Sequence, residues 1–249
     1  MAAIRAEILK LKRSLNWAVV IGLPLAMVAS AIANSLASGE PLEAGWHTLW
    51  MRSVVFYGLF PLAIGIAILA SLVWRAEHRG SNWNALMSGP TPSLYIVIAK
   101  ATVVAGLAAV MQAVMLAAVF AIGKLVFGLE GTLPGEYIIA TVLIMIATIP
   151  VAVLQSALSM FLRSFAAPIA VGLVAAGISV AVLMTGSAIA TVSPYALASR
   201  ATQLGTGAFA DTGAITGGDI ASILITAALL TVVLIAATTV ILERRDTRI

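Results

Sequence analysis

The sequence of 249 residues contains no cysteine and only two histidines, His47 and His78. Without cysteine the chain has no disulfide, no thiolate metal ligand and no thiol nucleophile. Charged residues make up 10% of the chain, against roughly 25% in soluble domains, while 61% of the residues are hydrophobic. Fourteen basic and ten acidic side chains are too few to cover a water-facing surface, so the composition predicts a membrane protein.

Long uncharged stretches separate the few charged residues. A helix that crosses a membrane needs about 20 apolar residues, and six of these stretches are long enough. The predicted spans lie near residues 15–35, 53–74, 95–122, 138–161, 167–190 and 219–241. We therefore predict an all-α polytopic membrane protein in which residues 1–249 form one domain of six spans.

The basic residues are concentrated on one side of these predicted spans. Eleven of the 14 lysines and arginines fall on the side of the termini, and only Arg52, Lys124 and Arg200 fall on the other. The positive-inside rule then places both termini in the cytoplasm. This asymmetry also accounts for the net charge of +4 without a nucleic-acid partner.

Residues 1–14 precede the first span and have the pattern of an amphipathic helix. Ile4, Ile8 and Leu11 recur at helical spacing, and the charged residues lie off this stripe. Such a helix lies at the inner headgroup level. A plain basic anchor for the first span is the alternative.

Two segments on the outer side have distinct patterns. Trp46 and Trp50 lie one turn apart after Pro41, which predicts an interfacial helix in the aromatic belt. Residues 191–218 contain Pro194 and several glycines, which predicts a partly irregular outer loop.

Small residues recur at helix-packing intervals in two spans. The pattern consists of Ala101, Ala105, Ala109 and Ala113 in the third span, and of Gly172 and Ala176 in the fifth. Small residues at this spacing let another helix approach closely. They predict a seam within the subunit or between subunits, although chance regularity in an alanine-rich chain is the alternative.

The predicted spans lack the groups that catalysis requires. Both histidines lie outside them, and no charged residue lies near the middle of any span. The Gly123–Lys124 pair lacks the other residues of a phosphate-binding loop. We therefore expect no enzyme activity, metal or cofactor on this chain. Gln112, Gln155 and Ser159 form a possible substrate path, although a buried glutamine more often bridges neighbouring helices.

The inner segment 75–94 between the second and third spans is too long for a simple connector. Trp83, Leu86 and Met87 lie at helical positions i, i+3 and i+4, and Gly89 and Pro90 end the helix. This pattern predicts a short surface helix with one apolar edge. The edge either docks into a groove of a cytoplasmic partner or rests on lipid.

Two segments carry a family resemblance: AEILKLKRSLNW near the start, and NWNALMSGP in the inner segment. Together they resemble the membrane subunits of type-2 ATP-binding-cassette (ABC) exporters, in the lantibiotic-immunity and bacitracin-resistance branch. In that branch a Glu, a Trp, a Leu and a Pro recur before a Lys that enters the third span. The matching residues are Glu77, Trp83, Leu86, Pro90 and Lys100.

The resemblance implies a permease in the bacterial cytoplasmic membrane. It would pair with an identical or homologous permease chain and with two copies of a separate ATPase, which binds ATP and Mg²⁺. Residues 1–14 would be the connecting helix at the membrane surface. The ATPase contact would comprise Glu77, His78, Asn82, Trp83, Asn84, Leu86, Met87 and Pro90, with Arg163, Ser164 and Phe165 from the second inner loop.

The implied cargo is an amphipathic antimicrobial peptide or similar drug, because the spans offer no fixed charge to hold a small ion. A permease of the same architecture for a lipid or another natural product is the first alternative. A membrane scaffold that binds a partner and transports nothing is the second.

Overall fold

The computed structural model describes residues 2–12, 14–39, 42–79, 82–185, 192–209 and 211–246, and every regular element in these ranges is a helix. The helices are α1 (Ala2–Lys10), α2 (Asn16–Ser38), α3 (Trp46–Leu59), α4 (Pro61–Arg75), α5 (Asn82–Met87), α6 (Ser93–Leu125), α7 (Gly135–Ala147), α8 (Ile149–Phe161), α9 (Ala166–Met184), α10 (Pro194–Gln203) and α11 (Gly217–Asp246). The prediction of an all-α membrane protein is confirmed.

Five segments are long and apolar enough to cross a membrane: α2, α6, α7 with α8, α9 and α11. A sixth span results if the bent pair α3 and α4 counts as one. The sequence predicted one helix over 53–74, whereas the structure has two helices at 54° that meet at Phe60. The cause is Pro61, which has no N–H to continue the hydrogen bonds of α3.

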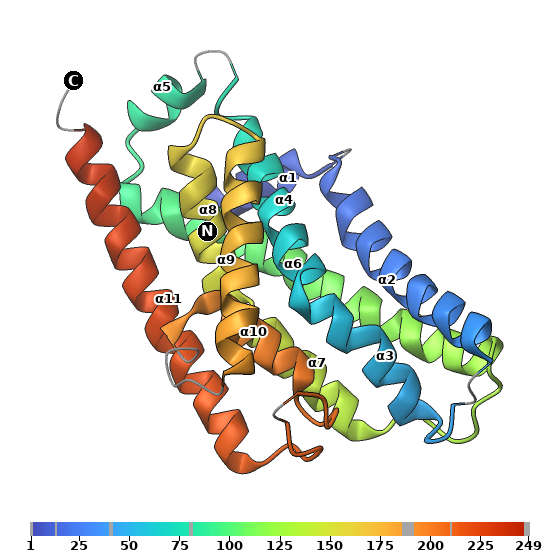
Figure 1. Cartoon of the computed structure of the whole chain (residues 1–249). Helices are drawn as coiled ribbons and strands as arrows, with labels where there is room; N and C mark the ends of the chain where they lie inside the picture. The colour runs from blue at the N-terminus through green and yellow to red at the C-terminus, as the bar shows by residue number, and fades with distance from the viewer. Residues whose placement is uncertain are drawn as a thin grey trace.

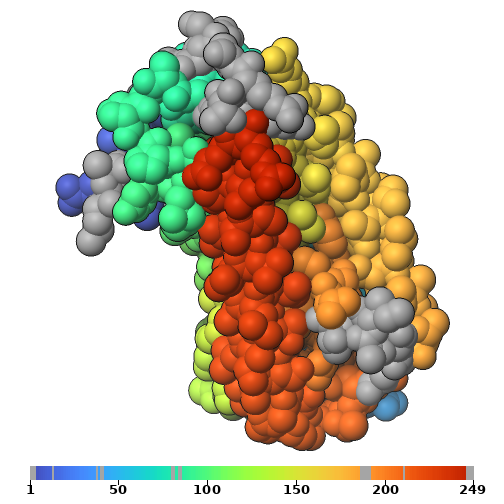
Figure 2. All heavy atoms as spheres, turned by 90° about the vertical axis from the view of Figure 1, so that its left-hand side faces the viewer, coloured from blue at the N-terminus to red at the C-terminus, as the bar shows by residue number. Residues whose placement is uncertain are grey.

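The helices α4, α6 and α8 occupy the middle of the bundle, and α11 runs along one side (Figure 1). In the space-filling view α11 extends along the full length of one face (Figure 2). Only 11% of its most apolar segment is buried, against 61% for the span formed by α7 and α8. The exposed apolar side of α11 therefore faces lipid or another membrane chain.

Both described ends of the chain lie at the same end of the bundle, together with α5 (Figure 1). Leu242 of α11 packs there in a small apolar cluster with Trp74, Ile96, Val97 and Met160. We call this the α5 end. The location of the two chain ends at one end of the bundle agrees with an even number of membrane crossings. The assignment of this end to the cytoplasm stays a prediction.

Trp46 and Trp50, which were predicted to lie at the outer membrane interface, pack inside the subunit. Trp46 is 8% exposed and Trp50 is 1% exposed. Trp46 donates a hydrogen bond to the carbonyl of Glu130 at 2.9 Å, and Trp50 stacks on Tyr137 with ring centroids 5.1 Å apart. The prediction of an interfacial helix was wrong, because the residues around Trp46 form the first turns of α3 and direct both indoles into the core.

Helix α10 packs against α3, α7 and α9. Ser199 of α10 donates a hydrogen bond to the carbonyl of Gly58 in α3 at 2.8 Å. The two helices approach closely, since a Cβ on Gly58 would lie 2.5 Å from the Cβ of Thr202. The outer segment thus contains a buried helix, which holds α3 in place; residues 186–191 and 210 lie outside the described residues.

Candidate functional site

A group of four charged residues, which we call the charge cluster, joins three helices at the α5 end. Lys100 of α6 is 1% exposed. Its Nζ donates to Glu7 of α1 at 2.8 Å and to Glu77, just after α4, at 2.7 Å. Lys10 donates to the same two carboxylates at 2.8 and 2.6 Å. Two positive and two negative side chains therefore balance each other.

The arrangement explains how a lysine can be buried at this depth. An isolated buried ammonium group is costly, and a counter-charge with good hydrogen-bond geometry offsets that cost. Lys100 has two carboxylate partners, and its Nζ also lies 4.9 Å from the ring centroid of Trp74. The cluster thereby fixes α1 against α4 and α6.

The same contacts shift the pKa values of two members of the cluster. Burial alone raises the pKa of Glu77, but the hydrogen bonds and charges of Lys10 and Lys100 outweigh it and lower the pKa below its usual value. Burial lowers the pKa of Lys10, but the bonds to Glu7 and Glu77 outweigh it and raise the pKa. Both groups are therefore charged near neutral pH.

His78, the next residue after Glu77, contacts α8 and α5 rather than the charge cluster. Its Nε2 donates to the carbonyl of Ser159 in α8 at 2.7 Å. Its ring stacks on Trp83 of α5, with centroids 5.8 Å apart and planes 12° apart. Trp74 also contacts Trp83, at 6.2 Å between centroids, and donates to Ser156 Oγ at 2.9 Å. His78 thus joins α5 to α8.

The apolar edge of α5 is packed against the bundle itself. Trp83, Leu86 and Met87 contact the apolar cluster that contains Trp74 and Leu242. In the structure this edge is partly buried against the bundle, and its predicted contact with a partner or with lipid stays a prediction. The side of this segment that is free to meet a partner includes Asn82, Ser88 and Pro90, which are exposed. The Asn84 side chain lies outside the described residues.

Residues 3–179 match the sequence family described as ABC-2 family transporter protein. The chain belongs to this family. An ABC-2 permease is a transmembrane subunit of an ABC transporter, is generally not catalytic itself, and works with an ABC ATPase. Comparison with curated proteins and with solved structures found no match.

Within the described residues of this ABC-2 permease, the loop between α8 and α9 lies beside the segment that follows α4. Arg163, Ser164 and Phe165 line a cleft together with His78 and Ser159. The structure thus brings together two regions that the sequence predicted to contact the ATPase. That contact itself stays a prediction.

The two predicted path glutamines are buried and bridge helices. Gln112 donates to the hydroxyl of Tyr57 at 3.0 Å, and Gln155 donates to the hydroxyl of Tyr195 at 2.6 Å. They are 1% and 0% exposed. Ser159 lies one helical turn after Gln155 in α8 and lines the cleft near His78. Their role in a substrate path stays a prediction.

The small-residue patterns lie mainly inside the subunit. A Cβ on Gly172 would lie 2.3 Å from the amide nitrogen of Gln155 and 3.3 Å from the Cβ of Ala67, so α9 packs closely on α8 and α4 here. Ala176, one turn later, is fully buried. In α6 the exposure of the alanines increases along the helix. Ala101 is buried, Ala105 and Ala109 are half-buried, and Ala113 is exposed.

The sequence did not identify Glu7 and Lys10 as part of the site, because both were placed on the polar side of an amphipathic helix. A signal was present. Lys100 falls within the predicted third span, where a charged residue needs an opposite charge nearby. A search for that partner among the residues near the inner ends of the spans leads to Glu7 and Glu77.

Proposed function

We propose that this ABC-2 permease is the membrane subunit of an exporter of amphipathic antimicrobial peptides or similar drugs, which protects the cell that carries it. ATP hydrolysis on a separate ABC ATPase drives export through the segment from Glu77 to Met87. The permease works in the bacterial cytoplasmic membrane with a second permease chain, identical or homologous.

The observation that supports this coupling route is the pair of consecutive residues Glu77 and His78. Glu77 bonds to α1 and α6 through the charge cluster, and His78 bonds to α8 and stacks on α5. A displacement of α5 by a partner is therefore passed to helices on both sides of α4. Packed elements transmit such a displacement as a rigid-body shift.

The proposed cargo class follows from what the spans offer for recognition. No charged residue lies near the middle of a span, so binding there relies on apolar contacts and on neutral polar groups. A peptide with an apolar face satisfies these conditions, whereas a small ion does not.

The coupling route can be tested at an exposed position of the loop. Ser88→Arg adds a bulky charge next to α5 without removing an internal contact, and Thr212→Arg is a matched control at an exposed position on the opposite end. The permease is purified with its ATPase, and ATP hydrolysis is measured with and without a lantibiotic peptide. We expect Ser88→Arg to lose ATPase binding or stimulation and Thr212→Arg to keep both.

Unchanged stimulation in Ser88→Arg would contradict the coupling route. The cargo assignment fails separately, if the ATPase co-purifies and responds to a phospholipid but not to the peptide. If no ATPase accompanies the permease from native membranes in mild detergent, the result favours the scaffold interpretation.

A further inference from the structure

A second cleft at the α5 end lies between α1, the start of α2 and the end of α4. We call it the α2 cleft. Its volume is about 230 Å³, whereas one water needs roughly 10–15 Å³. Apolar side chains such as Leu15 and Leu72 line it together with polar side chains from all three segments. The cleft can therefore take a molecule larger than water that has both polar and apolar parts.

Asn16, the first residue of α2, leaves a hydrogen-bond acceptor without a partner in the wall of this cleft. Asn16 is 2% exposed and lines the cleft. Its backbone N–H and its Nδ2 both donate to Ser14 Oγ. Its Oδ1 is buried and accepts no hydrogen bond from the described residues. A buried acceptor without a donor is unfavourable, so the amide favours a bound molecule that carries a hydrogen-bond donor.

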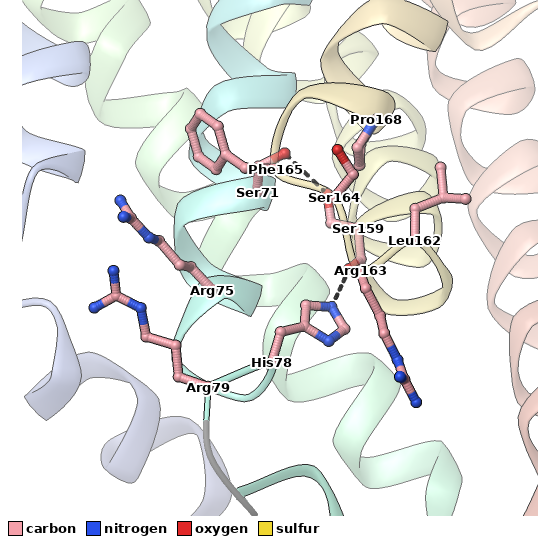
Figure 3. A pocket seen from close by; sticks show the side chains of 10 residues that line it. All are labelled: Ser71, Arg75, His78, Arg79, Ser159, Leu162, Arg163, Ser164, Phe165 and Pro168. Carbon is pink, nitrogen blue, oxygen red and sulfur yellow. Dashed lines mark hydrogen bonds between the residues drawn. The ribbon is translucent and has the colours of Figure 1, made fainter.

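Arg75 and Arg79 line the same cleft from α4 and the turn after it. Both are exposed, and their side chains extend side by side, away from Arg163 (Figure 3). Arg75 also lies over the ring of Phe165 at 5.7 Å. Among the residues that the structure describes, neither Arg75 nor Arg79 forms an ion pair. Neighbouring positive charges repel each other, so an anionic group beside the two guanidinium groups is favoured.

The α2 cleft lies at the level where two membrane spans end. The first candidate span begins at Asn16, and the bent span of α3 and α4 ends at Arg75. Leu15 in the cleft is 65% exposed, and Trp17 beside it is 42% exposed. Basic and aromatic side chains at the ends of spans lie among lipid headgroups. The molecules that surround the cleft at this level are therefore membrane lipids.

We propose that the α2 cleft binds the headgroup of an aminophospholipid, such as phosphatidylethanolamine, from the leaflet at the α5 end. The phosphate oxygens accept charge-assisted hydrogen bonds from Arg75 and Arg79, and the ammonium group donates to Asn16 Oδ1. The Glu7 carboxylate also lines the cleft, which favours a charged donor over a neutral hydroxyl group. The acyl chains stay in the bilayer beside Leu15. The site belongs to the permease alone and does not depend on the proposed cargo or coupling.

The test compares two phospholipids of equal net charge. Phosphatidylethanolamine has N–H donors on its headgroup, whereas the quaternary ammonium of phosphatidylcholine has none. Each lipid, labelled with a fluorophore on an acyl chain, is titrated into the purified full-length permease in neutral detergent micelles. Glycerophosphoethanolamine, which has the same headgroup without acyl chains, is the soluble comparison ligand.

Three variants separate the two halves of the site. Asn16→Leu removes the free acceptor at similar volume. Arg79→Gln removes one charge from the cleft. Arg5→Gln is the matched control, because it removes an exposed charge of α1 that does not line the cleft.

We expect the unmodified permease to bind phosphatidylethanolamine about tenfold more tightly than phosphatidylcholine, because only the first lipid satisfies Asn16. In Asn16→Leu this ratio should fall to about twofold or less. Arg79→Gln should weaken the binding of both lipids about tenfold and keep their ratio, since both carry the phosphate. Arg5→Gln should change either affinity by less than about twofold. Thermal unfolding identifies any variant that does not fold, and the comparison of the two lipids on the unmodified protein needs no variant.

Equal binding of the two lipids to the unmodified permease would overturn the proposal, and so would a preference that persists in folded Asn16→Leu. Equal losses in Arg79→Gln and Arg5→Gln would mean that general surface charge attracts the lipid. Glycerophosphoethanolamine that binds as tightly as the lipid would mean that the ligand is a soluble compound.

Discussion

Replacing Glu77 by glutamine tests whether the charge cluster stabilises the fold. The change removes the charge but keeps the shape of the side chain. The bond to Lys100 joins side chains that are 1% and 6% exposed, and a buried charged bond of this kind contributes about 1.5–3 kcal/mol. The bond to Lys10, whose side chain is 46% exposed, adds about 0.2–1 kcal/mol. The two contributions predict a loss of roughly 2–4 kcal/mol in the free energy of unfolding.

The assay is unfolding of the purified permease by SDS in mixed micelles, followed by tryptophan fluorescence. Glu130→Gln, at an exposed position on the opposite end, should change the free energy by less than about 0.5 kcal/mol. The double variant Glu77→Gln with Lys100→Met leaves the balanced pair of Glu7 and Lys10. It should therefore lose less stability than the sum of the two single variants, by about 1 kcal/mol or more. Additive losses, or a Glu77→Gln variant as stable as the unmodified protein, would refute this account of the cluster.

Further predictions concern pH, the loop and one close helix contact. The pKa of Glu77 is below its ordinary value of 4.5. The unmodified protein should therefore keep its full stability advantage over the Glu77→Gln variant above pH 4.5. This advantage should disappear as the pH falls through the lowered pKa. SDS unfolding of both proteins at a series of pH values measures it. An advantage that grows at acidic pH would contradict the predicted direction of the pH dependence. Trp83→Ala removes the stacking on His78 that holds α5. Trypsin should then cleave the chain after Arg79 about tenfold faster. An unchanged cleavage rate would show that other contacts hold α5. Gly58→Ala should cost about 1–3 kcal/mol in unfolding free energy through overlap with α10. Gly106→Ala, which meets no atom within 4 Å, should be neutral or slightly stabilising; equal effects of the two changes argue against the close contact.

Much of the membrane layout could be predicted from the spacing of charges, because a charged side chain near the bilayer centre is unfavourable wherever it occurs. The break in the second span was predictable in principle from Pro61, yet hydropathy is uniform across residue 60 and does not distinguish one helix from two. The prediction of an interfacial helix at Trp46 and Trp50 failed because tryptophan is favoured both at membrane interfaces and in packed cores. Only Gly123, which leaves room for the ring of Trp46, distinguishes the two environments.

The candidate site was predictable in part. The order of residues placed Glu77 and His78 before a short helix with Trp83 on its apolar edge. Helical periodicity identifies an apolar edge but does not identify the surface that covers it, and here the bundle itself covers part of it. The pairing of Glu7 with Lys100 spans 93 residues, and such long-range pairs depend on the tertiary fold rather than on local pattern.

The break at Phe60 separates α4 from α3, so that α4 can act as a lever about this point. Helix α10 anchors α3 through Ser199 and Gly58, whereas α4 meets α3 only end to end. From Phe60 to Glu77 the lever is about 25 Å long at 1.5 Å per residue. Tilting it by about 10° would therefore move the carboxylate by roughly 4 Å. A modest tilt at the proline pivot would widen the bundle at one end and leave the opposite end shut.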